Sequence, residues 1–225
     1  MKIRKWIFGL VCLCLFGPSR FLTAQADLEE TWEKDANKRQ PPGQVMDMVG
    51  IKPGMIIGEI GAGRGRYTVH LAQRVGDQGR VYANDIDPDA LEYLKARCRK
   101  NRIANIETVL GKVDDPLFPR TGLDMIFMVW TYHMMEKPVE MLRSLVPYLE
   151  PGATVVMIEP VPAETEHEIE VATARLGKKP SDINIVSEDS VRRDAAAAGF
   201  EFVRMDSSLR KDNIFILKAK AGAGI

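Results

Sequence analysis

The chain has 225 residues, in which 31 lysines and arginines balance 31 aspartates and glutamates. A formal charge of zero argues against the basic surface of a nucleic-acid-binding protein, and the length favours one folded domain over two. Cys98 is the only cysteine after residue 26, so an internal disulfide is excluded for residues 27–225. We expect Cys98 to pack in the core rather than to act as a nucleophile.

Residues 1–26 have the three parts of a secretory signal peptide. A basic start is followed by an apolar run over residues 6–16 and by an Ala-Gln-Ala site at residues 24–26. The apolar run is too short to span a bilayer comfortably. We therefore expect cleavage after Ala26, no stable membrane span afterwards, and a periplasmic or secreted protein. A retained N-terminal membrane anchor is the alternative.

Residues 27–54 predict a polar helical lead-in that ends in a Gly-Ile-Lys-Pro-Gly turn at residues 50–54. Trp32 in this segment is interpreted either as a wall of a ligand pocket or as a packing anchor. We favour the anchor, because buried aromatic side chains mostly serve packing.

Residues 55–67 carry the strongest functional signal in the chain. An apolar run, typical of a buried strand, leads to the acid Glu59. Three glycines, Gly61, Gly63 and Gly65, come next, and a helical pattern begins at once. A strand, a glycine turn and a helix bring a small ligand against bare backbone, because glycine adopts positive φ and has no Cβ.

The spacing of this motif separates two kinds of ligand. A dinucleotide fingerprint requires a third glycine where this chain has Arg66. A carboxylate at the end of the strand suits a cationic amine and would repel a pyrophosphate. The pattern Glu-x-Gly-x-Gly-x-Gly instead resembles motif I of the class I S-adenosylmethionine (SAM) methyltransferases. That resemblance implies SAM as the cofactor, with the acid beside its methionine end. It predicts a binding turn made of Glu59, Gly61, Ala62, Gly63 and Gly65.

The second predicted strand, residues 80–85, ends at Asp85, twenty residues after the last motif glycine. A nucleotide-binding α/β unit places an acid here that accepts hydrogen bonds from the ribose hydroxyls. We therefore expect Asp85 to bind the ribose and Ile86 to lie against the adenine. Asp87 is expected to be the N-cap of the next helix, with Pro88 as its first residue.

The third predicted strand, residues 106–110, leads into a further cofactor segment. The family resemblance places an acid or an amide here that binds the adenine amine. Lys112 occupies the position where that acid is commoner. We therefore assign the role to Asp114 and include Val113 in the cofactor pocket.

The rest of the chain alternates strands with helices, which predicts a mostly parallel sheet covered on both faces. The predicted elements are strands at 123–130 and 153–159, a helix ending at Pro147, a charged segment at 160–186 with a helix near 164–176, a helix at 187–198, and a hairpin of 200–205 and 214–218. This order resembles the class I methyltransferase fold. The prediction is a doubly wound, Rossmann-like α/β domain over residues 55–220. Its sheet has seven strands, mostly parallel, and ends in an antiparallel hairpin.

The segment after the fourth strand is the candidate reaction site, because ligands in doubly wound sheets bind beyond the carboxyl ends of the strands. It reads Trp130-Thr131-Tyr132-His133-Met134. A group of small methyltransferases has a similar Asp-Thr-Tyr-His-His sequence, so Trp130 replaces the acid and Met134 the second histidine. We expect the segment to lie near the transferable methyl group.

His133 is the predicted general base for an acceptor that must lose a proton, because its ordinary pKa is near the working pH. The alternative for His133 is capping or packing at the strand end. Tyr132 would orient the substrate or line the adenine pocket. Glu159, at the end of the fifth strand, is a second candidate base.

The predicted reaction is methyl transfer from SAM to a small-molecule acceptor. The alternative is an exported, non-catalytic protein that binds SAM or a nucleoside on a degenerate methyltransferase fold. No metal site is expected, because His167 lies among glutamates typical of a solvated helix face. His70 is expected to face solvent or its neighbours on the first helix of the domain.

Overall fold

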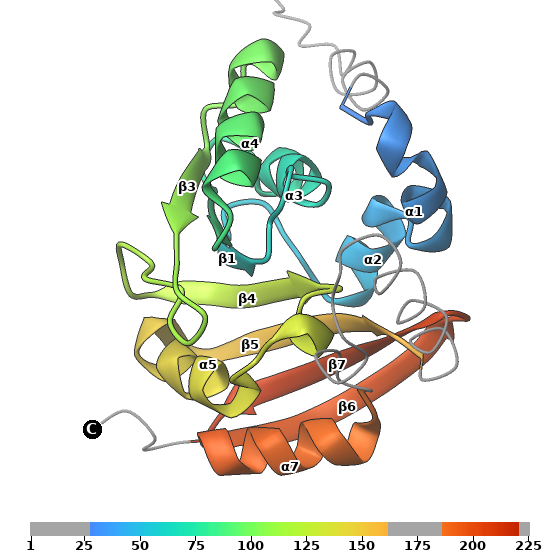
Figure 1. The fold of residues 1–225 in the computed structure, drawn as a ribbon, viewed down its shortest axis with the longest axis vertical. Helices are drawn as coiled ribbons and strands as arrows, with labels where there is room; N and C mark the ends of the chain where they lie inside the picture. Colours follow the sequence, from blue (N-terminus) through green and yellow to red (C-terminus); the bar gives the residue numbers. More distant parts are fainter. Residues whose placement is uncertain (1–27, 162–185, 221–225) are drawn as a thin grey trace, which may run out of the picture.

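The computed structural model describes residues 28–161 and 186–220 (Figure 1). The predicted signal segment at residues 1–26, the predicted helix near residues 164–176 and His167 all lie outside the described residues. Among the residues described, no helix is both long and apolar enough to cross a membrane. The same residues contain no group of three or more acidic, histidine or cysteine side chains placed to hold a metal ion.

The described strands form one seven-stranded sheet. They are β1 (Ile56–Ile60), β2 (Arg80–Asp85), β3 (Ile106–Leu110), β4 (Leu123–Val129), β5 (Leu149–Pro160), β6 (Phe200–Leu209) and β7 (Asp212–Ala219). Their order across the sheet is β3-β2-β1-β4-β5-β7-β6. β1 to β5 run parallel, and β7 pairs antiparallel with β5 and β6. The predicted fold class is therefore confirmed.

Consecutive residues of the central strands are buried on opposite faces of the sheet. In β4, Met125 and Phe127 pack in one apolar cluster, and Ile126 and Met128 pack in the other. Because side chains alternate between faces with a period of two, the sheet has one core on each side. This double burial explains why β4 reads as an almost unbroken apolar run.

Helices cover both faces of the sheet (Figure 1). α2 and α3 contribute to the core on one face, and α5 and α7 contribute to the core on the other. The described helical elements are η1 (Thr31–Glu33), α1 (Lys34–Arg39), α2 (Pro42–Met48), α3 (Thr68–Val75), α4 (Pro88–Asn101), η2 (Tyr132–Met134), α5 (Pro138–Leu145), η3 (Val146–Tyr148) and α7 (Glu188–Ala198).

Two helix boundaries follow from the local sequence. Asp87 caps α4 by accepting a hydrogen bond from the backbone N–H of Asp89 at 2.9 Å, as predicted. The predicted last helix is also confirmed. Ser187 caps its start, and it ends at Gly199, which has a left-handed φ of 90°.

The closing hairpin is longer than predicted. β6 and β7 both continue beyond the predicted residues 205 and 214 toward their connecting turn. Ser207 and Ser208 break the apolar alternation of this edge strand, and its pairing with β7 shifts register nearby. Backbone pairing rather than burial therefore extends the hairpin, and an apolar pattern could not predict it.

The lead-in is attached by an ion pair rather than by Trp32. The indole of Trp32 is 48% exposed and donates to Glu30 Oε2 at 2.7 Å, so the prediction of a buried anchor is wrong. Glu33 of η1 is instead fully buried against Arg97 of α4, with N–O distances of 2.6 and 2.8 Å. A buried charged pair therefore joins the lead-in to α4, in addition to the apolar packing of Val45 and Met46 of α2.

His70 is buried on α3, so of the two expected alternatives it faces its neighbours and not solvent. Among the described residues, neither of its ring nitrogens has a hydrogen-bond partner. Burial, together with the positive charges of Arg97 and Arg66, lowers the pKa of His70 to about 4. α3 packs against the lead-in helix α2 as well as the sheet, and His70 is 5% exposed.

We expect His70 to make the protein less stable in acid. The unfolded chain binds a proton at an ordinary pKa of about 6.5, whereas the folded chain resists it until about pH 4. The free energy of unfolding should therefore fall as the pH drops from 6.5 to 4, by up to about 3 kcal/mol from this residue. Urea unfolding at several pH values should show a shallower acid loss for His70→Leu than for wild type. Parallel curves for the two proteins would contradict the prediction.

Candidate active site

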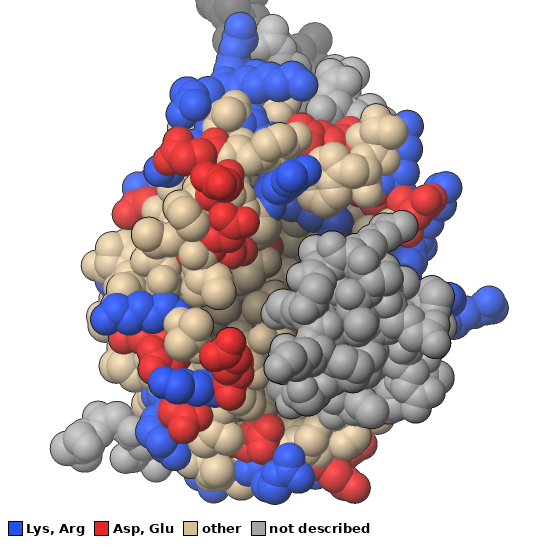
Figure 2. Space-filling view, viewed as in Figure 1, with Lys and Arg blue, Asp and Glu red and all other residues tan. Residues whose placement is uncertain are grey.

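A cavity of about 380 Å³ lies at the carboxyl ends of the parallel strands. Its walls come from the ends of β1 and β2, the loops after β3 and β4, and the first turns of α5. The lining residues are Ile60, Gly61, Asn84, Asp85, Ile86, Lys112, Val113, Trp130, Thr131, Met134, Met135, Glu136 and Met141. Basic and acidic side chains are mixed over the described part of the face in Figure 2. Because the cavity lies at the carboxyl ends of the parallel strands, it is at the place where a doubly wound sheet is expected to bind a ligand.

The motif turn after β1 needs glycine for two reasons. Gly61, Gly63 and Gly65 all have left-handed φ values, of 74°, 52° and 87°. A Cβ on Gly61 would collide with the side chain of Thr131, whereas a Cβ on Gly63 would meet nothing within 4 Å. Ala62 is buried beside this turn, and its N–H donates to the carbonyl of Asn84 at 2.9 Å. The turn therefore exposes bare backbone next to the end of β2.

Asp85 joins the end of β2 to this turn. Its Oδ2 accepts from the N–H of Gly63 at 2.7 Å, and its Oδ1 accepts from the N–H of Asp87 at 3.0 Å. The carboxylate also lines the cavity. Each carboxylate oxygen can accept a further hydrogen bond, so Asp85 can hold the turn and bind ribose hydroxyls at the same time.

Glu59 is a buried carboxyl group with an unmet acceptor. It is 3% exposed, and its Oε2 has no hydrogen-bond partner among the described residues. Burial, with a smaller contribution from the charge of Asp85, raises the pKa of Glu59 to about 7 against the opposing effects of Thr68 and Arg66. A buried acceptor without a donor is costly. A cationic ligand amine beside Glu59 would both satisfy it and stabilise its ionised form.

The predicted adenine contacts separate into two groups. Ile86 and Val113 line the cavity as largely exposed apolar side chains, which fits a flat aromatic base. Asp114 does not line it. Its carboxylate accepts from Lys137 Nζ at 3.0 Å, and this ion pair lowers the pKa of Asp114. Asn84, which the sequence analysis did not select, lines the cavity beside Asp85, and its position at a strand end was a usable signal.

The predicted catalytic residues form a buried network beside the cavity. Glu159 of β5 accepts from the N–H groups of Thr131 at 3.0 Å and Tyr132 at 2.7 Å. Its other oxygen lies 2.5 Å from Nδ1 of His133. Glu159 therefore orders the loop after β4 and orients the imidazole of His133.

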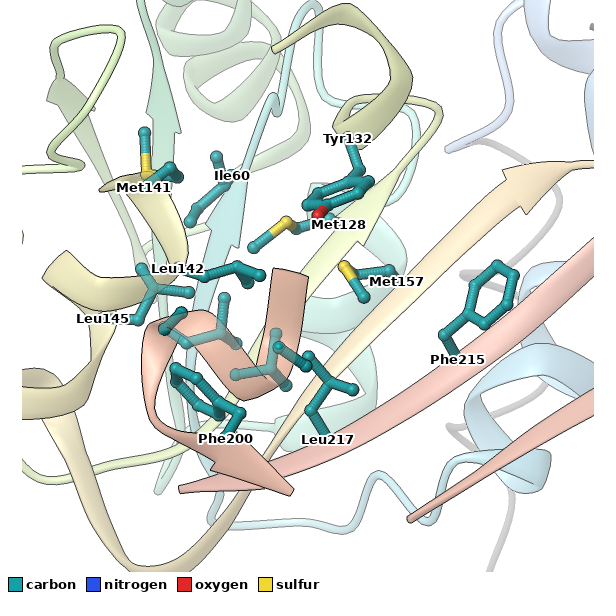
Figure 3. Packing of buried hydrophobic residues seen from close by; sticks show 14 of the residues in the cluster. Ile60, Met128, Tyr132, Met141, Leu142, Leu145, Met157, Phe200, Phe215 and Leu217 are labelled. Carbon is teal, nitrogen blue, oxygen red and sulfur yellow. The ribbon is translucent and has the colours of Figure 1, made fainter. Parts of the chain in front are cut away.

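Tyr132 turns away from the cavity. Its hydroxyl donates to Asp194 of α7 at 2.9 Å, and burial together with that carboxylate raises the pKa of Tyr132. Figure 3 shows its ring beside Met128 in the apolar core. Neither Tyr132 nor His133 lines the cavity, and both are buried. The structure therefore brings Tyr132, His133 and Glu159 together, but behind the cavity wall.

The sequence of the chain is similar to those of known methyltransferases. Residues 57–152, from β1 to the start of β5, match a family model described as a methyltransferase domain. Over these residues the chain is similar to a methyltransferase domain. A ubiquinone/menaquinone biosynthesis C-methyltransferase from Vibrio parahaemolyticus is 30% identical over 115 residues, which are 51% of this chain and 44% of that protein. A nocamycin O-methyltransferase from Saccharothrix syringae is 24% identical over 134 residues, 60% of this chain and 48% of that protein.

Solved structures share the fold of this chain. A SAM-dependent methyltransferase from Aquifex aeolicus superposes with a TM-score of 0.70 at 23% identity, covering 85% of this chain and 95% of that one. A [4+2]-cyclase superposes with a TM-score of 0.65 at 12% identity, covering 87% and 86%. The chain spans about half the length of the sequence relatives that it matches. Together the domain match and the relatives support SAM as the cofactor of this fold.

Proposed function

We propose that the protein transfers the methyl group of SAM to a small-molecule acceptor. The observation that carries the proposal is the pairing of Glu59 with Asp85 around the glycine turn. Glu59 directly precedes Ile60 and Gly61 of the cavity lining, and its buried Oε2 has no hydrogen-bond partner among the described residues. Asp85 itself lines the cavity. A ligand with a cationic amine at one end and a ribose at the other complements both groups.

The residues of the chain would divide the binding of the cofactor between them. Of the residues that line the cavity, Asp85 would accept from the ribose hydroxyls, and Ile86 and Val113 would flank the adenine. Glu59, buried next to this lining, would pair with the ammonium group through its unsatisfied Oε2. SAM when bound supplies a methyl group that is already activated for in-line displacement. The protein's main task is then to position the acceptor, which can account for much of the rate.

We further propose His133 as the base for an acceptor that must lose a proton. The support is the carboxylate of Glu159 at 2.5 Å from Nδ1, because a buried carboxylate stabilises the imidazolium that forms when a histidine takes up a proton. Glu159 would then act through His133 rather than as a base itself, since its oxygens already accept from the loop after β4.

The relatives support a small molecule as the acceptor, but they do not agree on which atom of the acceptor is methylated. One is named as a C-methyltransferase and the other as an O-methyltransferase, and the alignments cover about half of each. The even mixture of charges on the face in Figure 2 gives no support to a nucleic-acid acceptor.

A non-catalytic SAM-binding protein is the second candidate. It is favoured by the replacement of an acid by Trp130 and of a histidine by Met134, and by the position of Tyr132 and His133 behind the cavity wall. The fold does not exclude this candidate, because one fold can carry different functions. A structural neighbour with this fold, for example, is named as a cyclase and not as a methyltransferase.

Calorimetric titration of the full chain with S-adenosylhomocysteine (SAH), and separately with NADH, tests the proposal. We expect micromolar SAH binding and no NADH binding. Incubation with labelled SAM and a panel of phenols, hydroquinones, thiols and amines then separates the two candidates. A methylated product supports the enzyme, and SAH binding without any product supports the binding protein. Absence of SAH binding by a folded sample would reject both.

A further inference from the structure

Trp130 has a backbone conformation that a bulky residue rarely adopts. It lies directly after β4 with a left-handed φ of 52°, and it lines the cavity. Its N–H donates to the carbonyl of Ile158 at 2.8 Å. A left-handed conformation is unfavourable for a residue with a large Cβ substituent, so other contacts must hold it.

Asp212, the first residue of β7, provides the strongest of these contacts. It is fully buried, and its Oδ1 accepts from the indole N–H of Trp130 at 2.7 Å. The same carboxylate receives two hydrogen bonds from Arg39 of α1, from Nε at 2.6 Å and from Nη2 at 2.8 Å. Asp212 therefore joins the lead-in to the cavity wall through one buried group.

Two guanidinium groups pack against the indole. Arg39 lies 4.9 Å and Arg66 lies 4.8 Å from the centre of the Trp130 ring. Arg66 belongs to the motif turn after β1 and also donates to Gln40 at the end of α1, at 2.8 Å. Cation–π contacts of this kind are favourable within about 6 Å. The indole is thus held by groups from the lead-in, the motif turn and β7 together.

We propose that Asp212 is a positioning residue for the cofactor site, acting through Trp130 and Arg39. By holding Trp130 in the left-handed conformation, it places Thr131 against Gly61, where a Cβ on the glycine would collide with the threonine side chain. By binding Arg39, it keeps α1 closed beside the motif turn. This inference rests on the proposed function, and it extends the site to a residue that no motif in the sequence marks.

The test uses SAH affinity together with the environment of Trp130. In a background carrying Trp6→Phe and Trp32→Phe, Trp130 is the only tryptophan of the chain. Asp212→Ala should weaken SAH binding about tenfold and should make Trp130 more accessible to quenching by acrylamide. Asp212→Asn keeps an oxygen acceptor for the indole but loses the charge that Arg39 requires. It should retain most of the protection of Trp130 and show an intermediate SAH affinity.

Asp47→Asn is the matched control. Asp47 also joins the lead-in to the core, through Arg74 at 2.5 Å, but its side chain is exposed and does not line the cavity. It should change neither measurement. Equal SAH affinity and equal quenching in Asp212→Ala and the control would overturn the proposal. If Asp212→Ala does not fold, Trp130→Phe removes the same hydrogen bond from the other side and should show the same weakening.

A second measurement isolates the backbone. Glycine adopts a left-handed φ without strain, whereas alanine does not. Trp130→Gly should therefore be at least as stable to urea as Trp130→Ala, which reverses the usual order of the two residues. If Trp130→Gly were less stable than Trp130→Ala, the backbone at position 130 would not be strained. If wild type binds no SAH, the proposed function fails, whereas the quenching comparison still decides whether Asp212 holds Trp130.

Discussion

Replacing Asp85 with alanine should weaken SAH binding at least tenfold, a loss of about 1.4 kcal/mol. The carboxylate would bind the ribose, and it also accepts from the N–H of Gly63 and so holds the glycine turn in place. Asp85→Ala removes both contributions. Asp85→Asn keeps one oxygen acceptor and should give an intermediate affinity. Isothermal titration of the full chain provides the comparison.

Asp114→Ala is the control for this experiment. Asp114 was also predicted to touch the cofactor, but its carboxylate pairs with Lys137 and does not line the cavity. SAH affinity should be unchanged in this variant. A larger loss from Asp114→Ala than from Asp85→Ala would reverse the assignment of the two acids.

Replacing Arg97 with methionine should destabilise the protein by about 3–5 kcal/mol, because it leaves the buried carboxylate of Glu33 without its counter-charge. Arg97 is 3% exposed and Glu33 is fully buried. The guanidinium also donates to the carbonyl of Leu28 at 2.5 Å and to that of Arg64, in the motif turn, at 3.2 Å. Loss of Arg97 should therefore detach the lead-in as well as lower the free energy of unfolding.

Urea unfolding measures this loss, and two further variants separate its causes. The double variant Glu33→Gln with Arg97→Met removes the unpaired charge and should recover part of the stability. Lys95→Ala breaks an exposed pair with Glu92 on the same helix and should leave the unfolding midpoint almost unchanged. If Arg97→Met were no more damaging than Lys95→Ala, the buried pair would not anchor the lead-in.

The glycine turn and the position of Asp85 beside it could be predicted because their signals are local. The turn after β1 needs left-handed φ values at Gly61, Gly63 and Gly65, and the glycines reveal that need directly. Asp85 is recognisable because it ends a strand at a fixed distance from this turn. Adjacent parallel strands then bring the two segments to one edge of the sheet without any further information.

The placement of Tyr132 and His133 could not be predicted in the same way. The sequence places them after β4, but the direction of each side chain depends on the turn at Trp130 and on Glu159, which accepts from their backbone or ring. Glu159 itself looked like a second base, and its role in ordering the loop appears only when β5 lies beside β4. The directions of the Tyr132 and His133 side chains therefore depend on which strands are neighbours in the sheet, and the local sequence pattern does not contain that information.

The sequence by itself determined the fold, the glycine turn and the position of Asp85 beside that turn, since each depends on local period, on φ or on a strand end. Only the tertiary structure decided what closes the site. Trp130 meets Asp212 across 82 residues and Arg97 meets Glu33 across 64. Such contacts form because distant buried charges and polar groups must find partners once water is excluded, and no local pattern encodes which partner that will be.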